Sequence, residues 1–219
     1  MSWREVVEEN ERIVYEELGL PFIKDKMKAL GKAYYDTNLP WYYHLFVSFS
    51  KLKEDARVLE IGTARAEFTT WCAQLWPKGH IETIDVVQME GTEVLPDLDN
   101  VNYRVPFDSS RLLEEYPHKS FDFILIDGWH ENPQVSIDIF QCQYLLKDGG
   151  YAVLDDVVED DHADQLIKWE RKADHNSWTR KSTLEHFEKK GDFEITYMAR
   201  KLNKQDPPWA KQIAVLRKV

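Results

Sequence analysis

Two apolar segments that each end in acid constrain the fold of this chain more than any other feature. Residues 121–126 form a nearly unbroken apolar run that ends at Asp127, and residues 151–154 repeat the pattern before Asp155 and Asp156. Short apolar runs of this kind are typical of parallel strands that are buried on both faces. The sequence therefore predicts two parallel strands with acidic carboxyl ends.

The segment between the two runs predicts a crossover helix. Residues 134–146 place apolar side chains near helical spacing, and the stretch 148–150, Asp-Gly-Gly, ends the helix. Parallel strands joined by one right-handed crossover usually lie side by side or one strand apart, and open α/β sheets bind ligands outside the carboxyl ends of their strands. Asp127, Asp155 and Asp156 are therefore expected to converge on one crevice.

Three converging carboxylates need compensation, because each pair at ~4 Å repels by roughly 4 kcal/mol at an effective dielectric near 20. A cation, a proton on one acid, or separation by solvent would offset this repulsion. Oxygen ligands without a nearby cysteine favour a hard ion such as Mg²⁺, Mn²⁺ or Ca²⁺ over zinc. We expect Asp127, Asp155 and Asp156 to hold a divalent metal, with Mg²⁺ favoured. The alternative is that Asp155 or Asp156 caps the following helix, although capping does not account for Asp127.

His130 is the candidate general base, because it follows Asp127 by three residues. The ordinary histidine pKa of ~6.5 leaves an imidazole largely neutral at physiological pH, as a base requires. The simpler interpretation is a loop histidine that is hydrogen-bonded to a nearby acid. The aspartate pair downstream favours the catalytic interpretation.

A second pattern, N-terminal to these segments, predicts the strand–turn–helix–strand unit that forms one half of a nucleotide-binding fold. Residues 57–61 read as a strand that runs into a turn at Gly62, residues 68–76 as a helix, and residues 80–84 as a further strand that ends at Asp85. A glycine permits a turn that brings backbone close to a ligand, and an acid after the second strand can accept hydrogen bonds from ribose hydroxyls.

The glycine turn argues against a dinucleotide. Dinucleotide-binding enzymes usually have the motif G-x-G-x-x-G at this turn. This loop has only the first glycine, Gly62, with Ala64 and Glu67 at the second and third glycine positions. Pyrophosphate beside Glu67 would be disfavoured by like charge. A cofactor with a ribose and a sulfonium but no phosphate fits better, because Glu60 would then face a cationic amino acid moiety.

These segments resemble a known family. Residues 58–69, VLEIGTARAEFT, look like the first motif of class I S-adenosylmethionine-dependent methyltransferases, and residues 81–86, IETIDV, like the second. Residues 121–130 and 145–157, FDFILIDGWH and LLKDGGYAVLDDV, are similar to the later strands of the metal-dependent O-methyltransferases. Within that group the likeness is to catechol O-methyltransferase and, more closely, to the macrocin and mycinamicin type of sugar O-methyltransferase.

The resemblance implies an α/β fold: a doubly wound, mostly parallel seven-stranded Rossmann-like sheet with a final antiparallel strand pair. It also implies that Asp127, Asp155 and Asp156 hold the metal and that His130 is the general base. The family usually has glycines where Ala64 and Ala66 stand. The residues implied to contact S-adenosylmethionine are Glu60, Gly62, Thr63, Ala64, Asp85 and, as the adenine contact, Asp108.

The remaining segments are arranged around this domain. Residues 1–50 keep an amphipathic helical spacing and are expected to form an N-terminal helical extension or lid, and residues 51–219 are expected to form the cofactor-binding methyltransferase domain. Residues 194–199 and 212–216 read as the final strand pair. The aromatic-rich segment 39–46 is expected to be core, although it could also line an acceptor pocket or pack on a second copy of the chain, which leaves a homo-oligomer open.

Composition excludes several classes of partner. A net charge of -11 disfavours nucleic acid, because phosphate contacts need clustered lysine and arginine. No apolar run reaches membrane length, and the charged N-terminus has no signal-like apolar stretch, so we expect no membrane partner and a cytoplasmic protein. The two cysteines, Cys72 and Cys142, are expected to be reduced thiols in the core.

Three functions remain in play on the sequence alone. The first is a metal-dependent O-methyltransferase that acts on a small hydroxylated acceptor, either a sugar or polyol or a catechol-like phenol. The second is a metal-independent methyltransferase of the same fold, in which the aspartates are caps. The third is a metal-dependent hydrolase or a non-catalytic nucleotide-binding protein on this fold, because fold alone does not set function.

Overall fold

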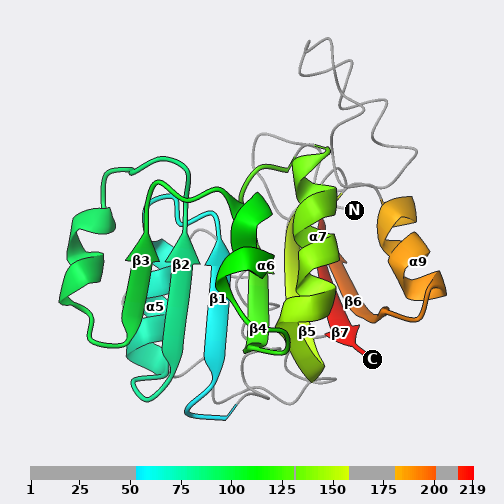
Figure 1. Ribbon diagram of the computed structural model, residues 1–219, viewed down its shortest axis with the longest axis horizontal. Helices are drawn as coiled ribbons and strands as arrows, with labels where there is room; N and C mark the ends of the chain where they lie inside the picture. The colour runs from blue at the N-terminus through cyan, green and yellow to red at the C-terminus, as the bar shows by residue number, and fades with distance from the viewer. Residues whose placement is uncertain (1–52, 131, 158–180, 201–211) are drawn as a thin grey trace, which may run out of the picture.

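The computed structural model describes residues 53–130, 132–157, 181–200 and 212–219, which form one seven-stranded sheet (Figure 1). The strand order is β3-β2-β1-β4-β5-β7-β6, with β1 to β5 parallel and β7 antiparallel to both β5 and β6. This confirms the predicted sheet and its final antiparallel pair. The strands are β1 (Arg57–Ile61), β2 (His80–Ile84), β3 (Val101–Arg104), β4 (Phe121–Ile126), β5 (Leu146–Val157), β6 (Phe193–Arg200) and β7 (Gln212–Lys218).

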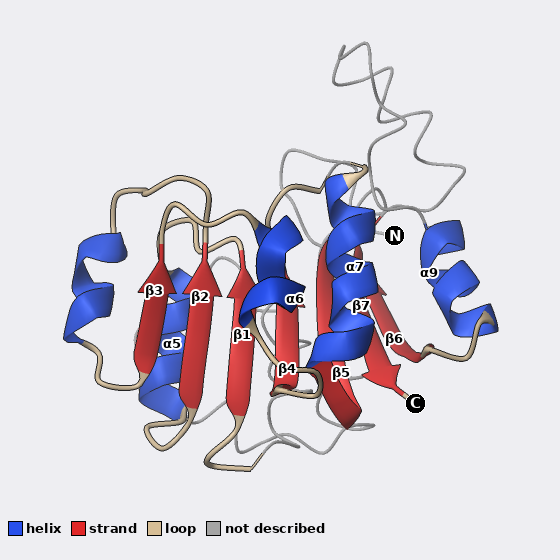
Figure 2. Ribbon diagram, viewed as in Figure 1, coloured by secondary structure: helices blue, strands red, loops and turns tan. Residues whose placement is uncertain are grey.

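Helices cover both faces of the sheet, as expected of a doubly wound fold (Figure 2). In that view α5 lies behind the sheet, whereas α6 and α7 lie in front of it. The described helices are α5 (Glu67–Leu75), α6 (Leu112–Glu115), α7 (Gln134–Leu145) and α9 (Lys181–Lys189), with short 3-10 turns at η2 (Thr92–Asp97) and η3 (Ser109–Arg111). Within these described segments, no helix is both long and apolar enough to cross a membrane.

Apolar side chains of the central strands form the core. Leu59 of β1 and Ile124 of β4 are completely buried, and they join Ile139 of α7 in one cluster on the front of the sheet. Burying a side chain of this size stabilises a fold by roughly 1.5–3 kcal/mol. The register pairs Ile126 with Leu154, so Asp127, which follows β4, and Asp155, near the end of β5, lie at the same edge of the sheet.

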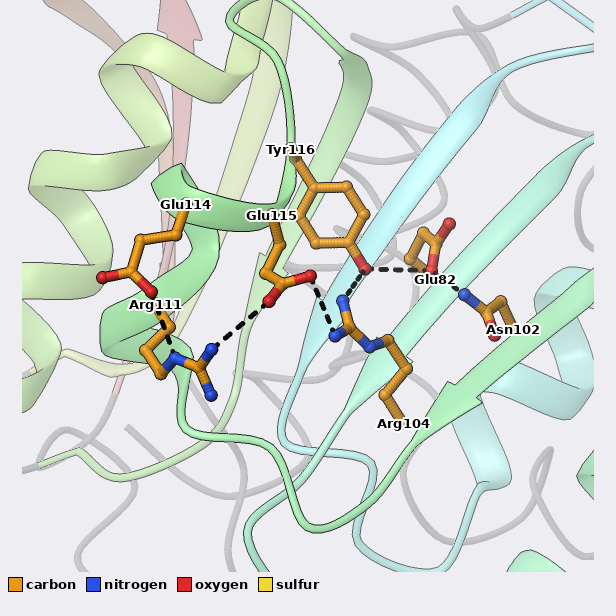
Figure 3. A network of polar contacts seen from close by, with 7 residues as sticks. All are labelled: Glu82, Asn102, Arg104, Arg111, Glu114, Glu115 and Tyr116. Carbon is orange, nitrogen blue, oxygen red and sulfur yellow. Dashed lines mark hydrogen bonds and ion pairs between the residues drawn. The ribbon is translucent and has the colours of Figure 1, made fainter.

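A polar network ties the segment after β3 to the sheet (Figure 3). Glu82 of β2 is only 4 % exposed, and its Oε2 accepts hydrogen bonds from Tyr116 Oη at 3.0 Å and Asn102 Nδ2 at 2.7 Å. Arg104 donates to Tyr116 Oη at 3.3 Å and pairs with Glu115 at 3.1 Å. A buried carboxylate is tolerated only with such partners. The network therefore holds α6 against β2 and β3, which fixes the path of η3 between them.

Most predicted elements agree with the structure. The strands predicted at 57–61, 80–84 and 121–126 have the observed bounds, and the helix predicted at 134–146 ends one residue earlier, at Leu145. The strand predicted at 151–154 is longer than expected, because β5 begins directly after the helix and contains the stretch 148–150 as well as Asp155 and Asp156. Cys72 and Cys142 are buried and free, as predicted. The predicted helical extension over residues 1–50 lies outside the described residues.

Candidate functional site

A cavity opens at the carboxyl ends of β1, β2 and β4. It encloses about 680 Å³, which is within the usual range of small-molecule sites. Its lining brings together residues from segments far apart in the sequence, and it includes five of the predicted site residues: Gly62, Ala64, Asp85, Asp108 and Asp127. The topology therefore places the predicted cofactor loop and the first predicted metal ligand on one crevice.

The loop after β1 is in backbone contact with the loop after β4. Gly62 has φ +98°, and its N–H donates to the Ile84 carbonyl at 2.9 Å. A Cβ on this residue would lie 2.3 Å from the carbonyl oxygen of Asp127. Ala64 and Ala66 stand where the resembled family usually has glycine, and both adopt positive φ, at 45° and 63°. The loop thus keeps a left-handed path at the cost of some backbone strain.

Two acids on the cavity wall are arranged to accept hydrogen bonds. Asp85 accepts from the backbone N–H groups of Ala64 at 3.0 Å and Val87 at 3.1 Å, which fixes its carboxylate beside the loop. Asp108 accepts from Ser110 N at 2.9 Å at the start of η3, and this hydrogen bond lowers the pKa of its carboxyl group. Both lie where the sequence places contacts to a ribose and a base.

Glu60 and Thr63 are placed differently from the expectation. Neither is among the described residues that line the cavity. Glu60 is 2 % exposed, and its Oε2 accepts hydrogen bonds from Thr69 and from Thr83 at 2.6 Å, whereas the Thr63 hydroxyl shares a hydrogen bond with Thr83 at 2.7 Å. Burial raises the pKa of Glu60 to about 8, against the lowering effect of the threonine hydrogen bonds. Its carboxyl group is therefore mostly neutral at pH 7 and buried behind the loop, and it does not offer a charge to the cavity.

The predicted metal ligands and base do come together. Asp127, His130 and Asp155 each offer a ligand atom, and these atoms all lie within 4.8 Å of one another. His130 Nε2 is 3.5 Å from Asp127 Oδ1 and 4.0 Å from Asp156 Oδ2. Consecutive strand residues normally point to opposite faces. The φ of +53° at Asp156 and a register shift between Leu154 and Val157 interrupt that alternation, so that both aspartates reach the cluster.

The donor set fits a divalent cation. Two carboxylates and an imidazole within this spacing can approach one ion, and carboxylate oxygens are typical ligands of Mg²⁺ and Mn²⁺. Asp155 and Asp156 are only 4 % and 6 % exposed, so their charges need compensation. His130 has one Nε2 atom, which can act either as a ligand or as a base, but not as both at once.

Comparison with known proteins decides the family. A protein-family profile described as a methyltransferase domain matches residues 40–197. The chain belongs to the methyltransferase domain family. The fold and family support S-adenosylmethionine as the methyl donor of this methyltransferase. No curated protein sequence matches it.

Several solved structures with the same fold are described as methyltransferases, and their sequence identity to this chain is low. One is a putative sarcosine dimethylglycine methyltransferase from Galdieria sulphuraria, with 12% identity, a TM-score of 0.63 and coverage of 81% of this chain and 84% of that chain. An S-adenosylmethionine-dependent methyltransferase from Methanosarcina mazei has 16% identity, a TM-score of 0.58 and coverages of 78% and 96%. The N-methyltransferase NodS from Bradyrhizobium japonicum has 16% identity, a TM-score of 0.58 and coverages of 91% and 98%. At these identities the likeness shows the fold alone.

The cavity wall and the contacts behind it also include residues that the sequence did not single out. Ser109 and Gln134 line the cavity, and Asp138 accepts a hydrogen bond from Gln134 Nε2 at 3.0 Å. Asp138 and Gln141 are 0 % and 2 % exposed, although both are polar residues on a helix. The sequence did contain one indication of this shared polar face. Gln134, Asp138 and Gln141 are spaced at i, i+4 and i+7, which places them on one face of α7.

Proposed function

We propose that this methyltransferase is a divalent-metal-dependent O-methyltransferase whose acceptor is a small hydroxylated molecule, either a sugar or polyol or a catechol-like phenol. The observation that carries the proposal is the cluster of Asp127, His130 and Asp155, with Asp156 beside it, at the edge of the cavity. Asp127 belongs both to the cavity lining and to the cluster, so an acceptor held by the cluster would lie next to the cofactor.

In this proposal the residues of the cluster have different roles in methyl transfer. Asp127, Asp155 and Asp156 would hold the ion, which when bound supplies positive charge that stabilises an acceptor oxygen as it loses its proton. His130 takes that proton, and the Asp127 carboxylate, whose Oδ1 lies 3.5 Å from His130 Nε2, stabilises the imidazolium that results. In-line displacement would require the cavity walls to bring the sulfonium methyl and the acceptor oxygen to about 3 Å from one another.

One observation favours a second candidate, a metal-independent methyltransferase. The Asp127 carboxylate lies 3.5 Å from His130 Nε2, so it would stabilise a protonated His130 without any ion. The solved NodS structure, which has the same fold, is named as an N-methyltransferase. Activity that survives a chelator would favour this candidate, whereas loss of activity that Mn²⁺ or Mg²⁺ restores would favour the first.

The metal proposal predicts that Asp127→Asn weakens divalent-ion binding by at least about tenfold, because ligand charge sets the affinity of such sites. Binding of Mn²⁺ to the whole protein, followed by electron paramagnetic resonance, measures this without an acceptor. Asp99→Asn, a change of the same charge at an exposed turn residue before β3, is the matched control. Equal Mn²⁺ affinity in both variants and the wild type would contradict the metal site.

The base proposal predicts that His130→Ala lowers turnover by about 10²–10⁴-fold while the affinity for S-adenosylhomocysteine stays within about twofold. His130 belongs to the acid cluster, but it is not among the described residues that line the cavity. Radiolabelled methyl transfer to a panel of catechols and sugars measures turnover, and calorimetry measures cofactor affinity. A fall in affinity that matches the fall in turnover would instead assign His130 a structural role.

A further inference from the structure

The polar face of α7 is not used by the proposed methyl transfer. Gln134, Asp138 and Gln141 share one helix face, and the two that lie deeper are almost completely buried. Aspartate is rarely buried to this degree unless its carboxyl group serves a partner. This face of α7 points towards η3, the turn that follows β3 and lines the cavity.

Two glutamines of this face hold Ser109. Gln134 Nε2 donates to Ser109 Oγ at 2.8 Å, and Gln141 Nε2 donates to the Ser109 carbonyl at 2.8 Å. Gln141 Oε1 in turn accepts from Leu113 N at 3.2 Å. Because Ser109 and Gln134 both line the cavity, beside Asp108, α7 fixes this part of the cavity wall.

Asp138 fixes the orientation of the Gln134 amide. Gln134 Nε2 donates to Asp138 Oδ1 at 3.0 Å in addition to its hydrogen bond to Ser109. Burial raises the pKa of Asp138 to about 6, and its Oδ1 is the acceptor in this hydrogen bond. Both N–H groups of the amide are therefore committed, and Gln134 Oε1 is left as the acceptor for a cavity ligand.

We propose that Gln134, oriented by Asp138, recognises the 6-amino group of the adenine of S-adenosylmethionine. Asp108 offers a second acceptor on the same wall, and the rings and methyl groups of Phe107 and Ile84 give an apolar surface for a flat base. An amino group has two N–H donors for two acceptors. A purine with a carbonyl group at the 6-position would place its oxygen against the acceptor oxygens of Gln134 and Asp108, and both hydrogen bonds would be lost. The inference rests on cofactor binding in this cavity, and it does not depend on the metal or on the acceptor.

The test compares S-adenosylhomocysteine with S-inosylhomocysteine, which has a carbonyl in place of the 6-amino group, by calorimetry without added metal. We expect the wild type to prefer the adenine ligand by at least about tenfold. Gln134→Met should lose about five- to tenfold in affinity for S-adenosylhomocysteine and less than about twofold for the inosine analogue. Gln143→Met, on the same helix but not on the cavity wall, should leave both affinities unchanged.

Asp138 is tested as a positioning residue by the same affinity ratio. Asp138→Asn keeps an acceptor for Gln134 and should keep most of the preference for adenine, whereas Asp138→Leu should reduce the ratio as Gln134→Met does. An unchanged ratio in Gln134→Met, or equal affinities in the wild type, would overturn the inference, and both are readable even if Asp138→Leu fails to fold. Failure of the metal proposal would appear separately, as Mn²⁺ binding that Asp127→Asn does not weaken.

Discussion

The Gly62→Ala variant is expected to lose at least about 3 kcal/mol of unfolding free energy, from overpacking and backbone strain together. The added Cβ would lie 2.3 Å from the carbonyl oxygen of Asp127 and 2.6 Å from Gly128 Cα. Both are backbone atoms, which cannot rotate away as a flexible side chain would. Relief therefore requires the loops after β1 and β4 to separate, and this moves Asp127 away from the site. Urea unfolding followed by circular dichroism measures the loss.

Gly191→Ala is the matched control for this change. Gly191 also has a positive φ, +79°, but a Cβ there would meet no atom within 4 Å. The free energy of unfolding of this variant should fall by only about 1–2 kcal/mol, the cost of placing alanine in the left-handed backbone region. The difference between the two variants isolates the close approach of the two loops. Similar losses in both variants would show that the contact between Gly62 and Asp127 is not tight.

The sheet and the acid cluster could be predicted because their signals are local and follow topological rules. β1 and β4 are short apolar runs followed by glycine or acid, and residues 57–61 and 121–126 have their observed bounds for this reason. The proximity of Asp127 and Asp155 could be predicted because parallel strands joined by a single crossover helix usually lie side by side or one strand apart. In the structure β4 pairs directly with β5.

The direction of Glu60 could not be predicted, because an almost continuous apolar strand does not tell which face each side chain takes. Leu59 and Ile61 join the core on the front of the sheet, so Glu60 points to the opposite face, where α5 supplies Thr69. Thr83, which also donates to Glu60, comes from the neighbouring strand 23 residues away. Such partners become visible only once the strands are paired.

The polar face of α7 was missed for a related reason. Polar stripes on helices usually face water, so the helical spacing of Gln134, Asp138 and Gln141 gave no reason to expect their burial. Here the segment from Ser109 to Leu113 lies against that stripe and buries it. A sequence pattern cannot distinguish a polar face that meets water from one that meets the backbone of a distant turn.

The second large effect is expected from Glu60→Gln, which should stabilise the domain increasingly as the pH rises. The pKa of Glu60 is about 8 in the folded protein, raised by burial and, to a smaller extent, by the charge of Asp85, against an ordinary value of 4.5. The native state thus binds this proton more tightly than the unfolded chain does. Stability from the proton is complete below pH 4.5 and is lost as the pH rises through 8. At about 1.4 kcal/mol for each pKa unit, the loss reaches about 5 kcal/mol.

The glutamine variant avoids this loss because its amide never ionises, while its carbonyl oxygen can still accept the hydrogen bonds of Thr69 and Thr83. Urea unfolding at pH 5, 7 and 9 should therefore give similar wild-type and variant stabilities at pH 5 and a gap of several kcal/mol at pH 9. Glu90→Gln, at an exposed position in the loop after β2, is the control and should follow the wild type at every pH. If the Glu60→Gln and wild-type curves ran parallel, the carboxyl group would be ionised in its buried position. Glu60 could then supply the negative charge towards the cofactor that its sequence position predicted.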